Sequence, residues 1–413
     1  MVILLSTVGS LGDLHPVLGL GQTLAAGGAK VFLVTHPFYR ERVLTAGLEF
    51  IGAGPEVHLF EEIKKNPQFL DPQSAPLAVW NEFVVPGVED FYQATYQAIQ
   101  EYHPVLLAGH FLAVGSLLAA YQTRLPVAVL MTTPTGWLSS EDLVLKGGYL
   151  PCFTRPIFRF LRERIFSYCS QSLKPVCEKL QIAWNNQIAE KAMRDVNLNL
   201  GLWSPFFRPA STDDPPRSFI CGFCQPFIDP SPLPPEIDQF LREGEPPVIV
   251  TFGSAASLHA RDLYSLVSQV SLSLNLRCLL IGPGLRELSV PGKVATADYL
   301  PYQVVFPRAK VIVHHGGINT IGDALQSGKP QMILPFCHDQ FDNAARCLRL
   351  GVGLRLDRYR LTEKTLSRTL SKVLQDAHLH STSEKIQQII IQEARGNQVA
   401  ATHLLSLVNR RSF

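Results

Sequence analysis

The sequence predicts an α/β protein with two Rossmann-like, doubly wound domains that face a central cleft. Three observations lead to this prediction. Apolar strand-like runs alternate with amphipathic helical stretches in both halves of the chain, which is the pattern of parallel βαβ units. A proline-rich stretch separates the two series, and 413 residues are more than one average core accommodates.

The first series opens with the strand-like run "VILLSTVG" and continues through "KVFLVTH", "PVLLAGHF" and "LPVAVLMTT". The opening run has no basic region and no cleavage site, so we expect a buried first strand rather than a signal peptide. Together these elements predict an N-terminal domain over residues 1–225.

Seven prolines between positions 226 and 247 cannot all lie inside helices or sheets, and they predict a linker over residues 226–246. The alternation then restarts with "PVIVTFGS", "RCLLIGPG", "KVIVHHGG" and "PQMILPF". These runs predict a second domain over residues 247–385, followed by a C-terminal helix over 386–413.

Composition excludes several classes of function. The net charge is only +2 without a long basic tract, so we expect no nucleic-acid partner. No run reaches about 18 apolar residues, so we expect no membrane span. The scattered cysteines indicate a cytoplasmic protein with reduced thiols. Cys221 and Cys224 have redox spacing but lie in a strand-like run, so we expect no redox role for them.

The stretch "VIVHHGGINTIGDAL" places histidine and glycine where a strand gives way to a helix. In parallel sheets this edge binds ligands, because the backbone N–H groups of the helix start point outwards. Gly316 and Gly317 allow close approach, His315 can donate to or charge-pair with a phosphate, and Asn319 and Thr320 can cap the helix and donate as well. The pattern predicts a diphosphate site, with a structural histidine in a tight turn as the alternative.

Asp339 and Gln340 follow the next strand, at the same edge of the predicted sheet. Their adjacent carboxylate and carboxamide suit the vicinal hydroxyls of a sugar. The alternative is an aspartate that caps a helix beside a solvated glutamine. Asp342 and Asn343 are expected to cap the helix that follows.

These residues carry a family resemblance. The segments "HHGGINTIGDAL" and "DQFDNA", with "STVGSLGDLHP" and "VIVTFGS", resemble the inverting nucleotide-sugar glycosyltransferases with the GT-B fold. The similarity is greatest to the rhamnolipid rhamnosyltransferase B type and to the bacterial and fungal sterol and macrolide glycosyltransferases. It spans essentially the whole chain and is most specific between Tyr299 and Asn343.

The resemblance implies a UDP- or dTDP-hexose as donor. His315 would bind the diphosphate, Asp323 the ribose, and Tyr299 would stack on the pyrimidine. Plant members have Trp and Gln where this chain has Tyr299 and Tyr302, which leaves uracil and thymine open. The residues that the resemblance assigns to the donor are Gly12, Ser254, Tyr299, Leu300, His315, Gly317, Asn319, Thr320, Asp323, Asp339 and Gln340.

Asp13 is the candidate general base, because it lies after the first strand, facing the cleft. The plant branch has a catalytic histidine here, and the branches that this chain resembles carry aspartate. A desolvated carboxylate can accept the proton of an acceptor hydroxyl. The alternatives are that Asp13 caps the first helix, or that His15 is the base. His110 is expected to line the acceptor pocket.

The sequence contains no D-x-D pair, so we expect no metal and no cofactor, with His315 and a helix N-terminus stabilising the leaving group. The expected enzyme is an inverting hexosyltransferase that acts on a hydroxyl of a lipophilic acceptor, such as a hydroxy fatty acid or a sterol. The alternatives are a non-catalytic subunit that binds nucleotide sugar or lipid, and a GT-B epimerase. The stretch 150–169 is expected either to form a wall of the acceptor pocket or to touch the inner membrane surface.

Overall fold

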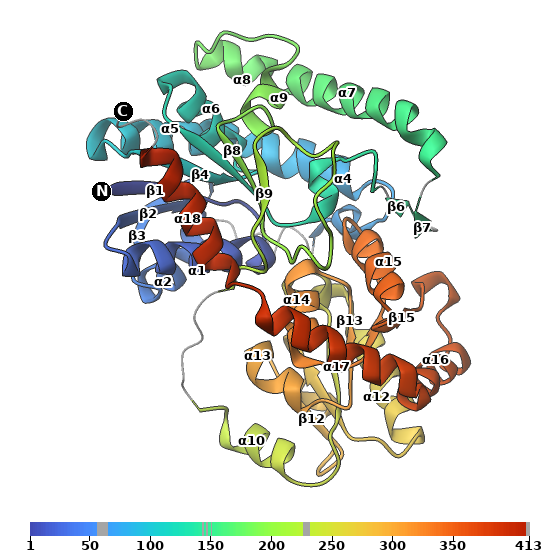
Figure 1. Ribbon diagram of the computed structural model, residues 1–413. Helices are drawn as coiled ribbons and strands as arrows, with labels where there is room; N and C mark the ends of the chain where they lie inside the picture. Colours follow the sequence, from blue (N-terminus) through green and yellow to red (C-terminus); the bar gives the residue numbers. More distant parts are fainter. Residues whose placement is uncertain (56–64, 143, 146–147, 150, 226–231, 410–413) are drawn as a thin grey trace.

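The computed structural model describes residues 1–409 with gaps at 56–64, 143, 146–147, 150 and 226–231. Two parallel sheets confirm the predicted fold class, and Figure 1 shows one in each half of the molecule. The N-terminal sheet has the order β3-β2-β1-β4-β5-β8-β9, and the C-terminal sheet has the order β12-β11-β10-β13-β14-β15. A short antiparallel hairpin, β6-β7, projects from the N-terminal half.

The strands of the N-terminal half are β1 (Val2–Ser6), β2 (Lys30–Thr35), β3 (Glu49–Gly52), β4 (Leu106–His110), β5 (Val127–Met131), β6 (Val144–Leu145), β7 (Gly148–Tyr149), β8 (Leu198–Gly201) and β9 (Ser218–Ile220). Those of the C-terminal half are β10 (Val248–Thr251), β11 (Cys278–Ile281), β12 (Val294–Ala297), β13 (Val311–His314), β14 (Gln331–Ile333) and β15 (Gly353–Arg355). The central strands are buried on both faces, which explains their nearly continuous apolar sequences.

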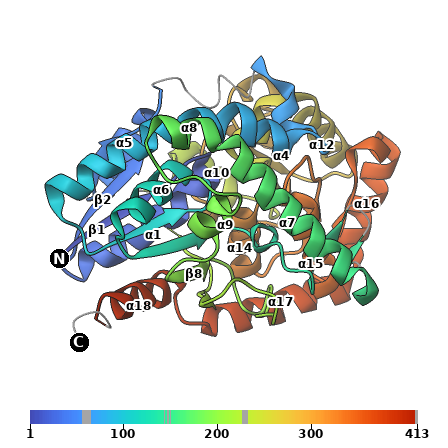
Figure 2. The ribbon, with the colours of Figure 1, turned by 90° about the horizontal axis from the view of Figure 1, so that it is seen from above.

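Helices cover both faces of each sheet (Figures 1 and 2). The helices of the N-terminal half are α1 (Leu11–Ala26), α2 (Arg40–Thr45), α4 (Ala75–Ala78), α5 (Val85–Tyr102), α6 (Val114–Thr123), α7 (Arg155–Ser172), α8 (Lys174–Lys179) and α9 (Ile188–Met193). Those that follow are α10 (Pro235–Arg242), α11 (Gly253–Ala256), α12 (Arg261–Ser273), α13 (Tyr302–Val305), α14 (Ile318–Ser327), α15 (Gln340–Leu350), α16 (Glu363–Gln375), α17 (Ala377–Gln392) and α18 (Gly396–Asn409).

The predicted linker contains a helix that the proline argument did not foresee. Its first part, 226–231, lies outside the described residues, but α10 begins at Pro235. Proline is favoured in the first turn of a helix because that turn needs no N–H donor. Ile237 and Phe240 of α10 are buried in a cluster with β11, so this part of the stretch belongs to the C-terminal core. The domain boundaries at 225 and 247 stay predictions.

The predicted single helix over 386–413 is instead the end of α17 and a separate helix, α18. Helix α17 packs on α14, whereas α18 returns to the N-terminal half and packs on α1 (Figure 1). At the crossover, Gly396 lies so close to Gly222 that an added Cβ would come 2.6 Å from the Gly222 carbonyl oxygen. The close contact between Gly396 and Gly222 determines where the chain crosses between the halves. The two residues are far apart in the sequence, so no local pattern predicts this point.

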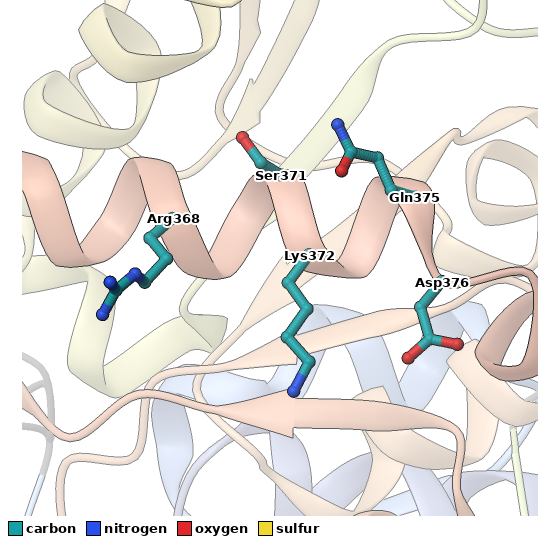
Figure 3. A pocket seen from close by; sticks show the side chains of 5 residues that line it. All are labelled: Arg368, Ser371, Lys372, Gln375 and Asp376. Carbon is teal, nitrogen blue, oxygen red and sulfur yellow. The ribbon is translucent and has the colours of Figure 1, made fainter.

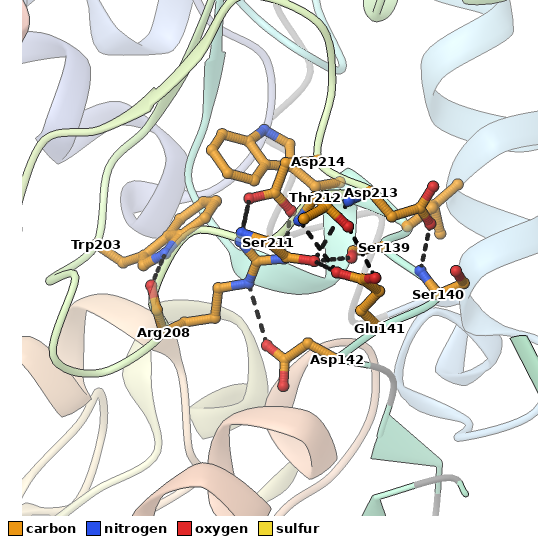
Figure 4. A network of polar contacts seen from close by, with 12 residues as sticks. Ser139, Ser140, Glu141, Asp142, Trp203, Arg208, Ser211, Thr212, Asp213 and Asp214 are labelled. Carbon is orange, nitrogen blue, oxygen red and sulfur yellow. Dashed lines mark hydrogen bonds and ion pairs between the residues drawn. The ribbon is translucent and has the colours of Figure 1, made fainter. Parts of the chain in front are cut away.

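A buried ion network joins the two halves beside β6. Asp142 accepts from Arg208 at 3.1 Å and also pairs with Arg346 of α15. Arg208 pairs with Asp214 as well, and Arg346 donates through Nε to Asp342 at 2.8 Å. Figure 4 shows the N-terminal part of the network, with the Arg208 guanidinium between Asp142 and Asp214. Because both arginines are almost fully buried, each depends on these carboxylates for its polar partners.

Candidate active site

Asp13 lies in the first turn of α1, directly after β1, and its two carboxyl oxygens have different environments. Oδ2 accepts a hydrogen bond from the Ser10 backbone N–H at 2.8 Å, and the Ser10 side chain caps the helix in return. This reciprocal capping has Ser10 as the cap residue of α1 and involves Asp13 through Oδ2 only. It leaves Oδ1 for chemistry, and the side chain is 26% exposed.

Gly9 makes this position of the carboxyl group possible. Its φ of +128° lies in the left-handed region, and an added Cβ would stand 2.2 Å from Oδ2 of Asp13. A side chain at position 9 would displace the carboxylate as well as strain the backbone. The glycine in "TVGSLGD" is thus a condition for the geometry of the site.

His110 lies against the other oxygen. Its Nε2 is 3.4 Å from Oδ1 of Asp13 and 3.2 Å from Oγ1 of Thr132. The three residues meet because β4 pairs with β1 on one side and β5 on the other, so their carboxyl ends share one edge of the sheet. The expectation that His110 lines the acceptor pocket is wrong, because its side chain is fully buried as the last residue of a central strand.

Burial shifts the pKa values of this group in opposite directions. It raises the pKa of Asp13 to about 7, and the nearby charge of Asp339 adds to that shift. It lowers the pKa of His110 to about 3, so the imidazole is neutral at physiological pH. A carboxylate with a pKa near 7 is well matched to accept a proton at neutral pH.

His15 belongs to a different environment. It lies two residues beyond Asp13 in α1, about 200° round the helix axis. Burial lowers the pKa of His15 to about 4, and the charge of Arg42 adds to that shift. The Arg42 guanidinium in turn lies over the ring of Tyr299 in the C-terminal half, 5.7 Å from its centroid.

In the C-terminal half, β13 delivers two histidines with different roles. Nδ1 of His314 accepts from the Gly316 N–H at 3.1 Å, and its Nε2 lies 2.9 Å from Oε1 of Gln331. His314 is fully buried, so the structural alternative holds for this residue. His315 is partly accessible, at the edge of the sheet where the diphosphate site was predicted.

Two glycines enclose the ring of His315. An added Cβ would come 2.7 Å from it at Gly253 and 2.4 Å from it at Gly317. Burial lowers the pKa of His315 to about 3, and His314 adds to that shift. The ring is therefore neutral at physiological pH and offers an N–H donor. It would bind a phosphate through a neutral hydrogen bond and not through an ion pair. Ser254 follows Gly253 on α11 and is partly buried.

The start of α14 differs from the prediction that Asn319 and Thr320 cap it. The cap residue is Gly317, with no side-chain hydrogen bond, and Thr320 is buried. The Asn319 amide instead donates to the Gly12 carbonyl at 2.6 Å. This bond joins the predicted donor site to the loop that holds Asp13.

Asp339 and Gln340, which were predicted to bind the sugar, form hydrogen bonds that order the loop before α15. Oε1 of Gln340 accepts from the N–H groups of Phe336 and Cys337, at 2.7 and 3.2 Å, so it orders this turn. Asp339 is the cap residue of α15, and its Oδ2 accepts from Asn343 at 2.7 Å. Burial raises the pKa of Asp339.

Asp342 and Asn343 do not cap α15, because Asp339 occupies the cap position. Asp342 pairs with Arg346 one turn further along the helix. The buried amide of Asn343 also donates to the Gly316 carbonyl at 3.0 Å, which ties the loop to the glycine turn after β13.

The remaining predicted donor contacts differ in accessibility. Tyr299 is 55% exposed, whereas the Leu300 side chain is buried in the core and could offer only its backbone. The Asp323 carboxyl accepts from Gln225 at 2.5 Å, and burial raises its pKa to about 7. Tyr302 is hydrogen-bonded to Thr251 at 2.6 Å and stacks on a core phenylalanine, so it has a structural role.

Thr132, Arg42 and Gln225 were not among the residues predicted from the sequence. Thr132 had a usable signal, because it follows the strand-like run "LPVAVLM" at the same edge of the sheet as His110. Arg42 and Gln225 act through contacts with the other half of the chain, for which the sequence holds no local pattern.

Two hollows lie outside this group of residues. One, on α16, is lined by Arg368, Ser371, Lys372, Gln375 and Asp376, and none of the predicted site residues belongs to it (Figure 3). The other lies between the halves and is lined by Gln68, Leu70, Asp71, Pro72, Ser74, His259 and Arg358. Beside the second hollow, the Phe69 carbonyl contacts Nε2 of His338 at 3.0 Å, next to Asp339.

Each half of the chain matches the model of a known domain family. Residues 3–129 match the glycosyltransferase family 28 N-terminal domain, and residues 282–405 match the erythromycin biosynthesis protein CIII-like C-terminal domain. The chain is 26% identical to a sterol 3-beta-glucosyltransferase of Arabidopsis thaliana over 86% of its own length. It is 27% identical to an O-mycaminosyltylonolide 6-deoxyallosyltransferase of Streptomyces fradiae, with 85% of that protein covered.

The chain spans only part of some relatives, namely 57% of the Arabidopsis enzyme and 27% of a sterol 3-beta-glucosyltransferase of Candida albicans. Among solved structures, it is similar to the kitacinnamycin glycosyltransferase, with a TM-score of 0.75, 19% identity and 98% of this chain and 99% of that chain covered. It is also similar to the glycosyltransferase VinC in complex with dTDP, with a TM-score of 0.74, 18% identity, and 99% and 100% covered. A glycosyltransferase domain model matches the N-terminal half, and solved glycosyltransferases share the architecture of both halves, so this chain has the GT-B fold and is similar to nucleotide-sugar glycosyltransferases.

Proposed function

We propose that this protein is an inverting, metal-independent hexosyltransferase that moves a sugar from a UDP- or dTDP-sugar to a hydroxyl of a lipophilic acceptor. The observation that carries the proposal is the meeting of two groups from opposite halves. Asn319, at the start of α14, bonds to Gly12 beside Asp13, and the charge of Asp339 raises the pKa of Asp13. These contacts support a proposed base and a proposed donor site that lie close together, on opposite halves of the chain.

The proposed reaction is a single displacement. The acceptor hydroxyl donates to Oδ1 of Asp13, and its oxygen attacks the anomeric carbon while the bond from that carbon to the diphosphate oxygen breaks. Asp13 takes the hydroxyl proton, and the electron pair of the broken bond leaves on the diphosphate. The uncapped N–H groups of α14 and the N–H of His315 stabilise that charge, as a cation does in other transferases.

Relatives support the choice of substrates. Two structural neighbours were solved with thymidine diphosphate, VinC and the spinosyn rhamnosyltransferase SpnG. The curated relatives act on sterols and on a macrolide precursor, which are apolar molecules with hydroxyl groups. We extend both properties to this chain as part of the proposal.

We further propose that α7 brings the enzyme to a bilayer that holds the acceptor. Ile157, Phe160, Leu161, Ile165 and Tyr168 of this helix are all at least 42% exposed. In both views α7 lies on the outer surface of the N-terminal half (Figures 1 and 2). An apolar face directed to solvent suits interfacial binding better than a pocket wall, which would cover it. No helix in the described part of the chain is long and apolar enough to cross a membrane.

Product analysis tests the proposal. The protein is incubated with one radiolabelled UDP- or dTDP-sugar and a lipid extract, with and without EDTA, and the organic phase is separated by chromatography. We expect a labelled glycolipid in both conditions, and none with Asp13→Asn. A non-catalytic subunit would bind the nucleotide sugar without forming product, and an epimerase would change the sugar without an acceptor. Either result would replace the proposed function.

A further inference from the structure

The mechanism above uses Asp13 but gives no role to His110, which is buried against it. The imidazole has 0% exposure, so it cannot touch the acceptor or the donor. Its Nε2 nevertheless lies 3.4 Å from Oδ1, the carboxyl oxygen that Ser10 leaves free. Oγ1 of Thr132, a residue that is itself 3% exposed, lies 3.2 Å from the same nitrogen.

We propose that His110 is a positioning residue that directs Oδ1 of Asp13 toward the acceptor and stabilises its charged form through the Nε2–H. This inference rests on the proposed function, because it assumes that Asp13 accepts the proton. In the more familiar pair, a histidine is the base and a carboxylate orients it. In this proposal the roles are exchanged, with Asp13 as the base and His110 as the residue that orients it. Here the carboxylate faces the cleft and the imidazole lies in the core.

The surroundings of the imidazole support this role. The ring of Phe111 packs 4.6 Å from it, so the ring cannot turn away without disturbing the core. The ring also has a hydrogen bond to the Val8 backbone, and a neutral imidazole has a single N–H. The proposed role therefore requires the tautomer with its proton on Nε2, the nitrogen beside Thr132 and Asp13, and this neutral ring needs no counter-charge. Burial of a polar ring in an apolar core costs free energy, so a histidine at this position is easier to explain if the ring interacts with a functional group such as Asp13.

Other ionisable groups face Asp13, but they do not provide this N–H. The hydroxyl of Tyr39 donates to the Gly9 carbonyl at 3.0 Å, so its proton is already engaged. Asp339 carries like charge and disfavours the ionised form of Asp13. Ser10 satisfies Oδ2, the oxygen on the helix side. Among these neighbours, His110 is the one placed to stabilise Oδ1.

The test compares His110→Leu with His110→Gln. Leucine fills the space of the ring without a donor, whereas the glutamine amide can return an N–H near the position of Nε2. Loss of a donor to the charged form raises the pKa of a carboxyl group. We therefore expect the acid limb of the kcat/KM profile to move up by roughly one pH unit in His110→Leu, with a loss of about five-fold at pH 7 that recovers at pH 9. His110→Gln should restore most of the wild-type profile.

His36→Leu is the matched control. His36 is another buried histidine, directly after β2, which lies on the other side of β1 from β4. Its ring packs against Phe38, Phe83 and Phe91. Its loss should leave the acid limb where it is. If His110→Leu lowers the rate equally at every pH, or leaves the profile unchanged, His110 has a structural role only and the proposal is overturned.

A second readout keeps the inference separate from the proposed function. In protein labelled with 13C at the aspartate carboxyl carbons, Asp13→Asn identifies the Asp13 signal, and its titration gives the pKa directly. We expect a higher pKa in His110→Leu than in the wild type even when no acceptor is present. Failure to find any transfer reaction would then refute the proposed function alone, and an unshifted Asp13 titration would refute the role of His110 alone.

Discussion

At the scale of single residues, the two oxygens of Asp13 divide capping from chemistry. The Ser10 N–H bonds to Oδ2, whereas Oδ1 lies 3.4 Å from Nε2 of His110 in a side chain that is 26% exposed. Capping and basicity are often treated as competing explanations for an aspartate in the first turn of a helix. Here one carboxyl group can serve both, because Gly9 leaves room for Oδ2 to turn back on the helix.

Asp13→Asn separates the two roles. The asparagine oxygen can still accept from Ser10, so the helix should keep its cap and the melting temperature should change little. The amide cannot take a proton, so kcat should fall by about 10²–10⁴-fold. In the wild type, kcat/KM should fall as the pH drops below about 7, because burial raises the pKa of Asp13 to that value and the carboxylate is then lost.

His15→Ala is the comparison in the same experiment. If His15→Ala is inactive while Asp13→Asn remains active, the base is His15. We do not expect this result, because His15 lies on the other side of α1. Nucleotide affinity, measured by titration calorimetry, should stay at the wild-type value in Asp13→Asn, because Asp13 lies in the other half of the molecule from the predicted nucleotide contacts.

At the scale of elements, the turn from β13 into α14 is the part of the predicted donor site whose local structure the sequence predicted best. An apolar strand, two glycines and a helical pattern are local signals, and each describes its own segment. The hydrogen-bond partners of these residues, in contrast, can lie far away in the sequence. The sequence suggested Asn319 as a helix cap, but its amide contacts Gly12, 307 residues away along the chain.

The glycines that enclose His315 give the second prediction. Gly317→Ala would place a Cβ 2.4 Å from Nε2 of His315 and displace the ring. We expect the affinity for UDP or dTDP to fall by roughly 2–10-fold, as in His315→Ala, because both changes remove one neutral hydrogen bond to the diphosphate. Gly87→Ala in α5 is the matched control, since its nearest neighbour is 4.0 Å away. Wild-type affinity in both Gly317→Ala and His315→Ala would exclude His315 from the nucleotide site.

The exposed face of α7 gives the third prediction. Ile157→Asp with Phe160→Asp should fold normally, because these side chains are 62% and 59% exposed. Each loses apolar area that a bilayer would cover, so sedimentation with anionic lipid vesicles should weaken by roughly 10–100-fold. Ile391→Asp on α17 is the control, with a similar exposure of 60% on another helix. Equal sedimentation of the double variant and the control would contradict a membrane role for α7.

At the scale of the whole molecule, the sequence predicted two sheets but not what holds them together. Each sheet has its own alternation of strands and helices, which periodicity detects. The contacts between the halves join residues far apart in the chain, such as Arg346 and Asp142, which are 204 positions apart. The return of α18 to α1 likewise depends on the close approach of Gly396 to Gly222, for which the sequence has no periodic signal.

The last prediction concerns the ion network between the halves. Arg346→Met would leave Asp142 with only the more distant Arg349, at 3.7 Å, as its partner from the C-terminal half, and would leave Asp342 buried without a partner in α15. Breaking one member of a buried ion network costs about 3 kcal/mol, so we expect the melting temperature to fall by roughly 6–10 °C. Lys179→Ala, which breaks an exposed pair with Glu89, should change it by no more than about 1 °C.

The double variant Arg346→Met with Asp342→Leu decides whether the cost comes from unpaired charge. Asp142 keeps Arg208, so the second substitution removes the carboxylate that Arg346→Met leaves alone in α15. We expect the double variant to melt several degrees above Arg346→Met, since both buried charges are then absent. If it melts lower still, packing of the arginine stem, and not its charge, would be what Arg346 contributes to the junction between the two halves.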